Sequence, residues 1–177
     1  MNTACQVNSV TVKDNKLADL SIGFDTPSLG VYNNQFDEGI AKSGIFINGE
    51  IKLVDIKHCE NKGTVSIART VIENIIINDC EIRDFRAFHA EIRSLEINDS
   101  SIERFVTFNI KANDFSFNNA SLNQQAVALN AVINNFDLSG LSISPDLIYE
   151  DEAYSLFHPG EVQASLKNDA LQLVNEQ

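Results

Sequence analysis

The sequence predicts an all-β protein, a right-handed parallel (quadrilateral) β-helix with about 20 residues in each coil. Three observations predict this fold: an apolar repeat of five residues, a sequence repeat of twenty, and opposite charges at positions twenty apart. We expect an N-terminal cap over residues 1–44 and the β-helix itself over residues 45–143. Residues 144–177 are expected to form a C-terminal helical cap or a dimerisation segment.

The five-residue repeat lies in the middle of the chain. Between Gly63 and Gly140 there is neither glycine nor proline, yet eleven asparagines and many β-branched residues disfavour a long helix. One apolar series consists of Ile72, Ile77, Ile82, Ile92, Ile97, Ile102, Phe117, Leu122, Val127 and Val132. A second apolar or small series consists of Ile75, Cys80, Phe85, Ala90, Leu95, Ser100, Phe105, Ile110, Phe115 and Ala120. Neither a helix nor an alternating strand produces both series, whereas a coil with four five-residue sides does.

The twenty-residue repeat supports the same coil. The segment 75–82 (Ile-Ile-Ile-Asn-Asp-Cys-Glu-Ile) returns with substitutions at 95–102 and at 115–122. Residues twenty apart would then lie one rung apart, at about 4.8 Å. Opposite charges at this spacing favour the pairing; the pairs are Glu73/Arg93, Arg83/Glu103, Asp84/Arg104 and Glu91/Lys111.

The same register predicts one ladder of amide side chains and one pair of like charges. Asn78, Asn98 and Asn118 would stack as an amide ladder at one corner, where each side chain bonds its neighbour. Asp79 and Asp99 form the only like-charged pair of the stretch from residue 71 to 134.

The repeat resembles the pentapeptide-repeat proteins, whose motif is a small residue, any or acidic residue, Leu or Phe, and two polar residues. The best matches are Cys80-Glu81-Ile82-Arg83-Asp84, Ala90-Glu91-Ile92-Arg93-Ser94, Ser100-Ser101-Ile102-Glu103-Arg104 and Ala120-Ser121-Leu122-Asn123-Gln124. The resemblance covers residues 65–143 and implies a square right-handed β-helix without catalytic machinery. Many members of that family bind other proteins, and some resemble duplex DNA in shape and charge and block topoisomerases.

The two ends of the chain are less regular. Residues 7–12 and 17–24 are strand candidates within the N-terminal cap. Ser144-Pro145 predicts the start of a first C-terminal helix, because proline is favoured at the first helical position. After Pro159-Gly160, a second helix is expected with an apolar stripe on one face. We expect these helices to cover the open last coil, whose bare strand edges would otherwise invite aggregation.

No catalytic, cofactor-binding or metal-binding constellation is expected, and the protein is predicted not to be an enzyme. The chain has no Gly-rich phosphate loop, and its three cysteines lie far apart without a Cys-x-x-Cys motif. His58-Cys59 lacks a second ligand pair for zinc, and His89 is expected to be a solvated ladder residue rather than an acid–base group. The absence of a long apolar run predicts a soluble, cytoplasmic protein.

The charge distribution suggests the kind of partner. The chain carries a net charge of −12, so it would repel nucleic acid and anionic membranes. Residues 112–177 contain nine acids and one base, a net charge of −8. This acidic third is expected either to aid solubility or to contact a basic protein, naturally a nucleic-acid-binding one. The candidate partner-binding acids are Asp137, Asp146, Glu150, Asp151, Glu152 and Glu161.

Two apolar features suggest interfaces. Phe88 and Phe108 follow inward positions, so they are expected to point outward and to stack one rung apart as part of the partner-binding surface. The alternative is that this face bulges and both rings turn inward, or that a terminal segment covers them. Leu166, Leu173 and Val174 lie in the stripe of the second C-terminal helix and are predicted to form a homodimer contact.

The function predicted from these features is non-enzymatic protein–protein interaction. The chain would be an acidic inhibitor or decoy of a nucleic-acid-binding protein, with DNA mimicry as one form of that role. A self-associating structural or assembly scaffold is the alternative from another class, and a carbohydrate-active β-helix is a third.

Overall fold

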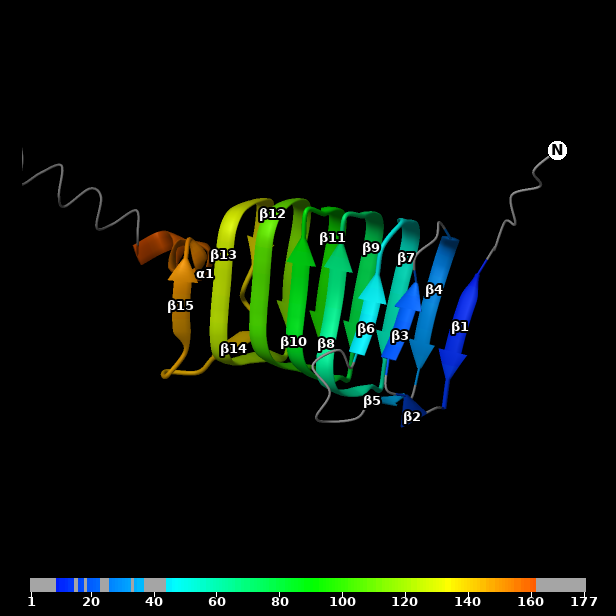
Figure 1. Cartoon of the computed structure of the whole chain (residues 1–177). Helices are drawn as coiled ribbons and strands as arrows, with labels where there is room; N and C mark the ends of the chain where they lie inside the picture. The colour runs from blue at the N-terminus through cyan, green and yellow to red at the C-terminus, as the bar shows by residue number, and fades with distance from the viewer. Residues whose placement is uncertain are drawn as a thin grey trace, which may run out of the picture.

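The computed structural model is a parallel β-solenoid of about six turns with about 20 residues per coil, which confirms the predicted parallel β-helix. Figure 1 shows the strands stacked as rungs from β1 (Val10–Lys13) at one end to β15 (Ile148–Asp151) and helix α1 (Ala153–Phe157) at the other. The structure describes residues 9–14, 16–17, 19–22, 26–32, 34–36 and 44–161. Among these residues, no helix has the length and apolar character required to cross a membrane.

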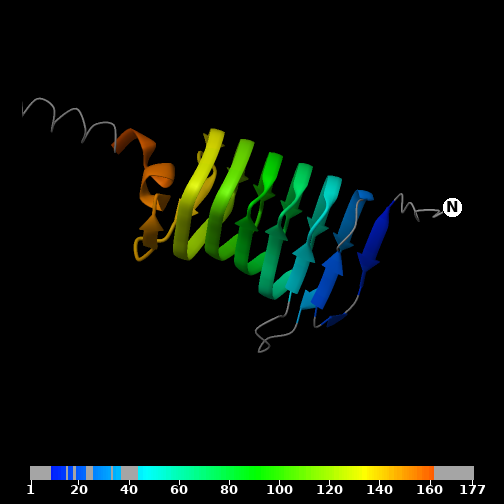
Figure 2. The ribbon, with the colours of Figure 1, turned by 45° about the horizontal axis from the view of Figure 1, so that its top comes forward.

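All strand pairings of the described residues are parallel, and a second view of the rungs shows the same stack (Figure 2). The short strands near the N-terminus are β2 (Lys16–Leu17), β3 (Asp19–Ile22), β4 (Thr26–Tyr32) and β5 (Gln35–Phe36). The central strands are β6 (Gly44–Ile47), β7 (Glu50–Lys57), β8 (Glu60–Ala68), β9 (Val71–Asn78), β10 (Glu81–Phe88), β11 (Glu91–Asn98), β12 (Ser101–Asn118) and β13 (Ala120–Asp137). The last short strand before β15 is β14 (Leu141–Ile143). Because β1 pairs with β4 and β4 with β7, the N-terminal strands continue the solenoid.

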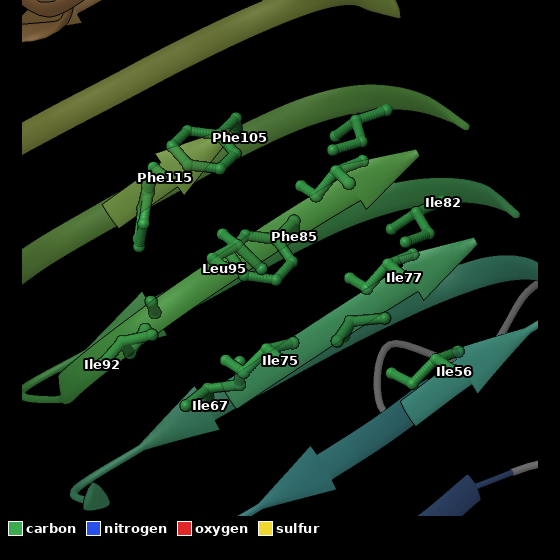
Figure 3. Packing of buried hydrophobic residues seen from close by; sticks show 14 of the residues in the cluster. Ile56, Ile67, Ile75, Ile77, Ile82, Phe85, Ile92, Leu95, Phe105 and Phe115 are labelled. Atoms are coloured by element: carbon green, nitrogen blue, oxygen red, sulfur yellow. The ribbon is translucent and has the colours of Figure 1, made fainter. Parts of the chain in front are cut away.

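The interior follows the five-residue repeat. Strand β9 buries its second, fifth and seventh residues, and β10 and β11 bury the same positions. Ile77, Ile97 and Phe117 lie in register on successive rungs and are at most 1% exposed, as the repeat predicts. Figure 3 shows buried side chains of successive rungs inside the coil, among them Ile75, Leu95 and Phe115.

Helix α1 closes the last coil. Phe85 and Phe105 stack in one interior column with ring centroids 5.3 Å apart, but Ala126 occupies the next rung of that column. The buried ring of Phe157 lies 6.0 Å from Phe105 and 5.3 Å from Phe136, so α1 supplies the volume that the small residue leaves.

The repeat places Val127 and Val132 inside, and this prediction is wrong. Val132 is 59% exposed, while Ala126 and Ala128 are buried. The pairing of β12 with β13 shifts by one residue after Ile102, so this coil holds one residue more than its predecessor. The extra residue moves the following apolar residues out of the five-residue phase.

Residues in the left-handed backbone region turn the chain at two opposite corners of each coil. They have φ between 48° and 53° and are His58, Arg69, Asp79, His89, Asp99, Asn109, Asn119 and Asn130. Their spacing is ten residues, and eleven across the two coils that carry an extra residue. Asn and Asp tolerate this conformation better than other residues with a side chain, and they occupy five of these eight corners.

Small hydrogen-bonding residues follow the left-handed corner at one side of the coil. Cys59, Cys80 and Ser100 are buried there, and Asn34 occupies the corresponding place in an earlier coil. The side chains of Asn34, Cys59, Cys80 and Ser100 bond the carbonyl two residues earlier, at 3.0, 3.3, 3.2 and 2.6 Å. The carbonyls of Tyr32, Asn78 and Asn98 also accept a backbone N–H from the neighbouring rung, so the side-chain donor adds a second bond at the corner.

The predicted amide ladder is present beside this corner. The Nδ2 atom of Asn98 donates to Oδ1 of Asn78, and Nδ2 of Asn118 donates to Oδ1 of Asn98, both at 2.7 Å. The ladder fixes the rung register independently of the apolar interior.

The C-terminal segment differs from the expected first helix. Residues after Ser144 form a turn and then strand β15, and the helix begins only at Ala153. Strand β15 pairs with the open edge of β13, where the half-buried Tyr149 packs against the core while Ile148 is 59% exposed. Residues 159–161 are helical and begin the second expected helix, whose stripe lies outside the described residues.

We expect the Ile97→Asp substitution to unfold the solenoid. Ile97 is 0% exposed, and an unpaired carboxylate in this interior costs several kcal/mol, which is comparable to the total stability of a domain. Circular dichroism with urea titration measures the loss. Glu96→Ala, at the exposed neighbouring position, is the control and should change stability by less than about 0.5 kcal/mol. A cooperative transition in Ile97→Asp at the wild-type midpoint would contradict the stacked interior.

We expect Arg69→Asn to stabilise the protein by about 0.5–1 kcal/mol, because Arg69 is an exposed residue at φ 52° and asparagine adopts this conformation at lower cost. The midpoint of urea unfolding measures the change. Arg93→Asn is the matched control in an exposed strand position, where asparagine has a lower strand propensity and should destabilise slightly. Equal effects at both sites would show that the corner conformation does not limit stability.

Candidate protein-interaction site

A shallow groove of about 750 Å³ crosses the rungs at the corner that carries Asp79 and Asp99. We call it the acidic groove. Its carboxylate and histidine lining residues are His58, Glu60, Asp79, Glu81 and Asp99, and among the side chains that the structure describes no lysine or arginine lines it. Ser101, Ser121 and Ser142 continue the lining toward the C-terminal end. The groove therefore offers carboxylates and hydroxyls, which suit cationic and hydrogen-bond-donating groups.

The corner side chains of the acidic groove form two hydrogen-bonded pairs. Nδ1 of His58 lies 2.8 Å from Oδ2 of Asp79, and Nδ2 of Asn119 donates to Oδ1 of Asp99 at 2.7 Å. Asp79 and Asp99 themselves occupy neighbouring rungs, about 4.8 Å apart along the solenoid. Two adjacent carboxylates repel each other, so a cation placed between them would gain energy from both.

A cluster of arginines surrounds one buried carboxylate on β10. The side chain of Asp84 is 1% exposed, and Arg104 on the next rung contacts both of its oxygens. Arg86 and Arg83 lie 3.4 and 3.7 Å from Oδ2 of Asp84. The Nε atoms of Arg83 and Arg86 are buried without a hydrogen-bond partner. The cluster therefore carries an excess of two positive charges and unused donors.

The twenty-residue register predicts four pairs of opposite charges on neighbouring rungs. Among the described residues, only the Asp84/Arg104 pair lies within ion-pair distance. Glu91 and Lys111 are in register on β11 and β12, but their exposed side chains make no ion pair in this part of the chain. Two opposite charges in register therefore form an ion pair only where they are buried, because exposed charges remain solvated.

Phe88 and Phe108 lie in register on β10 and β12, one rung apart as predicted. Their strand neighbours Ala87 and Thr107 are buried, so alternation directs both rings outward, where they are half-buried. We call the surface around them the aromatic face. Its outward residues are Ala68, Arg86, Phe88, Val106, Phe108, Val127, Leu129 and Glu150.

The acidic residues predicted to bind a partner lie at the C-terminal end of the solenoid. Hydrogen bonds from Ser139 lower the pKa of Asp137, and the side chain of Glu150 accepts a bond from Gln125 at 2.6 Å. The hydrogen bond from Tyr154 to Glu161 is 2.8 Å long and raises the pKa of the Tyr154 hydroxyl. The predicted partner-binding acids here are Asp137, Asp146, Glu150, Asp151, Glu152 and Glu161, all exposed. The predicted dimerisation residues Leu166, Leu173 and Val174 lie outside the described residues.

The remaining candidate groups have structural surroundings. Cys59 and Cys80 are free and buried, and the hydrogen bond with Cys59 together with burial raises the pKa of Cys80. His89 lies at a left-handed corner with its ring against Phe108, at 5.3 Å between centroids. Among the residues that the structure describes, no group of three or more His, Cys, Asp or Glu side chains is arranged to hold a metal ion.

The fold and these surfaces define a class of protein, a charged parallel β-solenoid with an acidic groove at one corner. No family model, no curated protein and no solved structure matches this chain.

Sequence reasoning missed the acidic groove and the arginine cluster as sites. The signal for the groove was the like-charged pair Asp79/Asp99, which the rung frame isolates. The signal for the cluster was the sequence Arg83-Asp84-x-Arg86 one rung below Arg104. Burial of Asp84 could not be predicted, because it depends on how the three guanidinium groups cover the carboxylate.

We expect Asp84→Ala to destabilise the protein by about 3 kcal/mol, because it leaves three guanidinium groups close together without their counter-ion. Thermal unfolding at low and high salt measures the loss, and added salt should recover part of it by screening. Asp114→Ala is the matched control, since this exposed carboxylate accepts only a 2.8 Å bond from Asn135. Equal losses at the two positions would contradict a special role for the cluster.

Proposed function

We propose that the protein is a non-enzymatic interaction module that binds a partner with a basic surface, most simply a nucleic-acid-binding protein. The observation that supports this proposal is the acidic groove, whose lining contains four carboxylates and, in the described part of the chain, neither lysine nor arginine. Acidic surfaces steer basic partners at long range and select them by charge pattern.

The resemblance to pentapeptide-repeat proteins supports the same role, since many of those proteins act by binding other proteins. The five-residue burial pattern agrees with that resemblance. The arginine cluster interrupts the acidic surface of the solenoid. The charges therefore favour binding of a partner at the acidic groove over mimicry of DNA along the whole length of the solenoid. We further propose a cytoplasmic location, which the two buried free thiols support.

The groove is tested by neutralising its carboxylates without changing its corners. The triple variant Asp79→Asn, Asp99→Asn, Glu81→Gln keeps side chains that tolerate the left-handed conformation at residues 79 and 99. We expect its affinity for the partner to fall about tenfold or more, and the wild-type affinity to fall steeply with salt. Affinity purification from the native host followed by mass spectrometry identifies the partner, and calorimetry measures the affinity.

The matched control is Glu73→Gln, Glu91→Gln, Glu96→Gln, which removes the same charge from exposed positions outside the groove. Wild-type affinity in the groove variant would refute the groove as the binding site. A separate variant reverses Asp146, Glu152 and Glu161 to lysine and tests the acidic C-terminal end. Lost capture with nearly unchanged thermal stability would extend the interface to that end.

A further inference from the structure

The aromatic face combines apolar and charged residues in a fixed order along the solenoid. One outward column runs Arg86, Val106, Val127, Glu150 on four successive rungs of β10, β12, β13 and β15. The neighbouring outward column holds Phe88, Phe108 and Leu129 on the first three of these rungs. Over these four rungs the face is therefore basic at Arg86, apolar in the middle and acidic at Glu150, while the column continues beyond Arg86 through Ser66 and Phe46.

This order is complementary to itself. A two-fold axis normal to the face and midway between the rungs of Val106 and Val127 reverses the column. The apolar middle of one copy then covers the apolar middle of the other, and Arg86 of each copy lies over the rung of Glu150 in the other. Arg86 and Glu150 are three rungs apart, about 14 Å, so both charged contacts form at once.

We propose that the protein forms a homodimer in which two aromatic faces pack across this two-fold axis. The half-buried rings and aliphatic side chains supply the apolar centre that such interfaces require. The side chain of Arg86 is 38% exposed, so its guanidinium group is accessible to a carboxylate of a second copy. The chain thus carries on one face every group that this partner needs.

The dimer goes beyond the proposed function and does not depend on it. The aromatic face ends at the corner of His89, whereas the acidic groove lies at the corner of Asp79, ten residues earlier in a coil of about 20. These corners are opposite each other. The dimer therefore leaves both grooves accessible and presents two binding sites to a basic partner.

The test is a charge swap between chains. Sedimentation equilibrium should give wild-type particles of twice the 19.6 kDa chain mass. Arg86→Glu alone and Glu150→Arg alone should each weaken the dimer about tenfold or more, since like charges then meet across the axis. An equimolar mixture of the two variants should restore a dimer close to wild-type strength, because both contacts become opposite in sign again. A folding defect would not be restored by mixing.

The matched controls are Arg93→Glu and Glu73→Arg, which make the same charge changes at exposed positions of β11 and β9 outside the aromatic face. They should leave the dimer unchanged. A monomer at every concentration, or weak dimers that mixing does not restore, would overturn the proposal. So would a dimer that survives both charge reversals, or one lost in the full-length variant Leu166→Glu, Leu173→Glu, which would place the contact in the C-terminal segment. Arg86→Glu should keep the groove's affinity for a basic partner, so the two proposals fail separately.

Discussion

The structure depends on the corner that closes each half of a coil. A residue with φ near 50° turns the chain every ten residues, and on one side a small buried donor then bonds the carbonyl two residues earlier. This geometry fixes where every following strand begins, so that equivalent residues stack on successive rungs. The Asn78–Asn98–Asn118 ladder and the Phe85–Phe105 stack both follow from that register. Without the corner neither ladder would form, because side chains slipped by one position would point to the opposite face.

The interior was predictable because a narrow coil leaves few choices. Ile77, Ile97 and Phe117 occupy the same inward position in three coils, and a repeat of five residues is enough to find them. The prediction failed after Leu122, where one extra residue shifts the phase. A single inserted residue is hard to detect in a degenerate apolar pattern. Val127 is apolar, as are Ala126 and Ala128, so the sequence does not reveal that the alanines are the buried residues. The burial of Phe157 in the last coil could not be predicted either, because the small residue that makes room for it, Ala126, follows the same insertion.

The candidate sites were predictable only in part. Phe88 and Phe108 were found from alternation alone, but Leu129 completes their column only when the extra residue is counted. The rung frame isolated Asp79 and Asp99 as a like-charged pair, whereas the groove beside them is a property of the folded surface. Charge pairs expected from register at Glu91 and Lys111 did not form, because solvated side chains gain little from contact. Local patterns specify which way a side chain points, and tertiary packing decides what it touches.

The arrangement of charge places two different surfaces next to each other. The acidic groove includes Glu81, and the arginine cluster begins two residues later, at Arg83 on the same strand β10. Residues two apart on a strand lie about 7 Å apart, which is within the Debye length of about 8 Å at physiological salt, so the charges of one surface act on the other. Asp84 keeps the three arginines together at a buried position, and the groove tolerates Asp79 beside Asp99 because both stay in water. A rigid ladder holds both surfaces in place, which allows one to bind a cationic partner while the other carries a different contact.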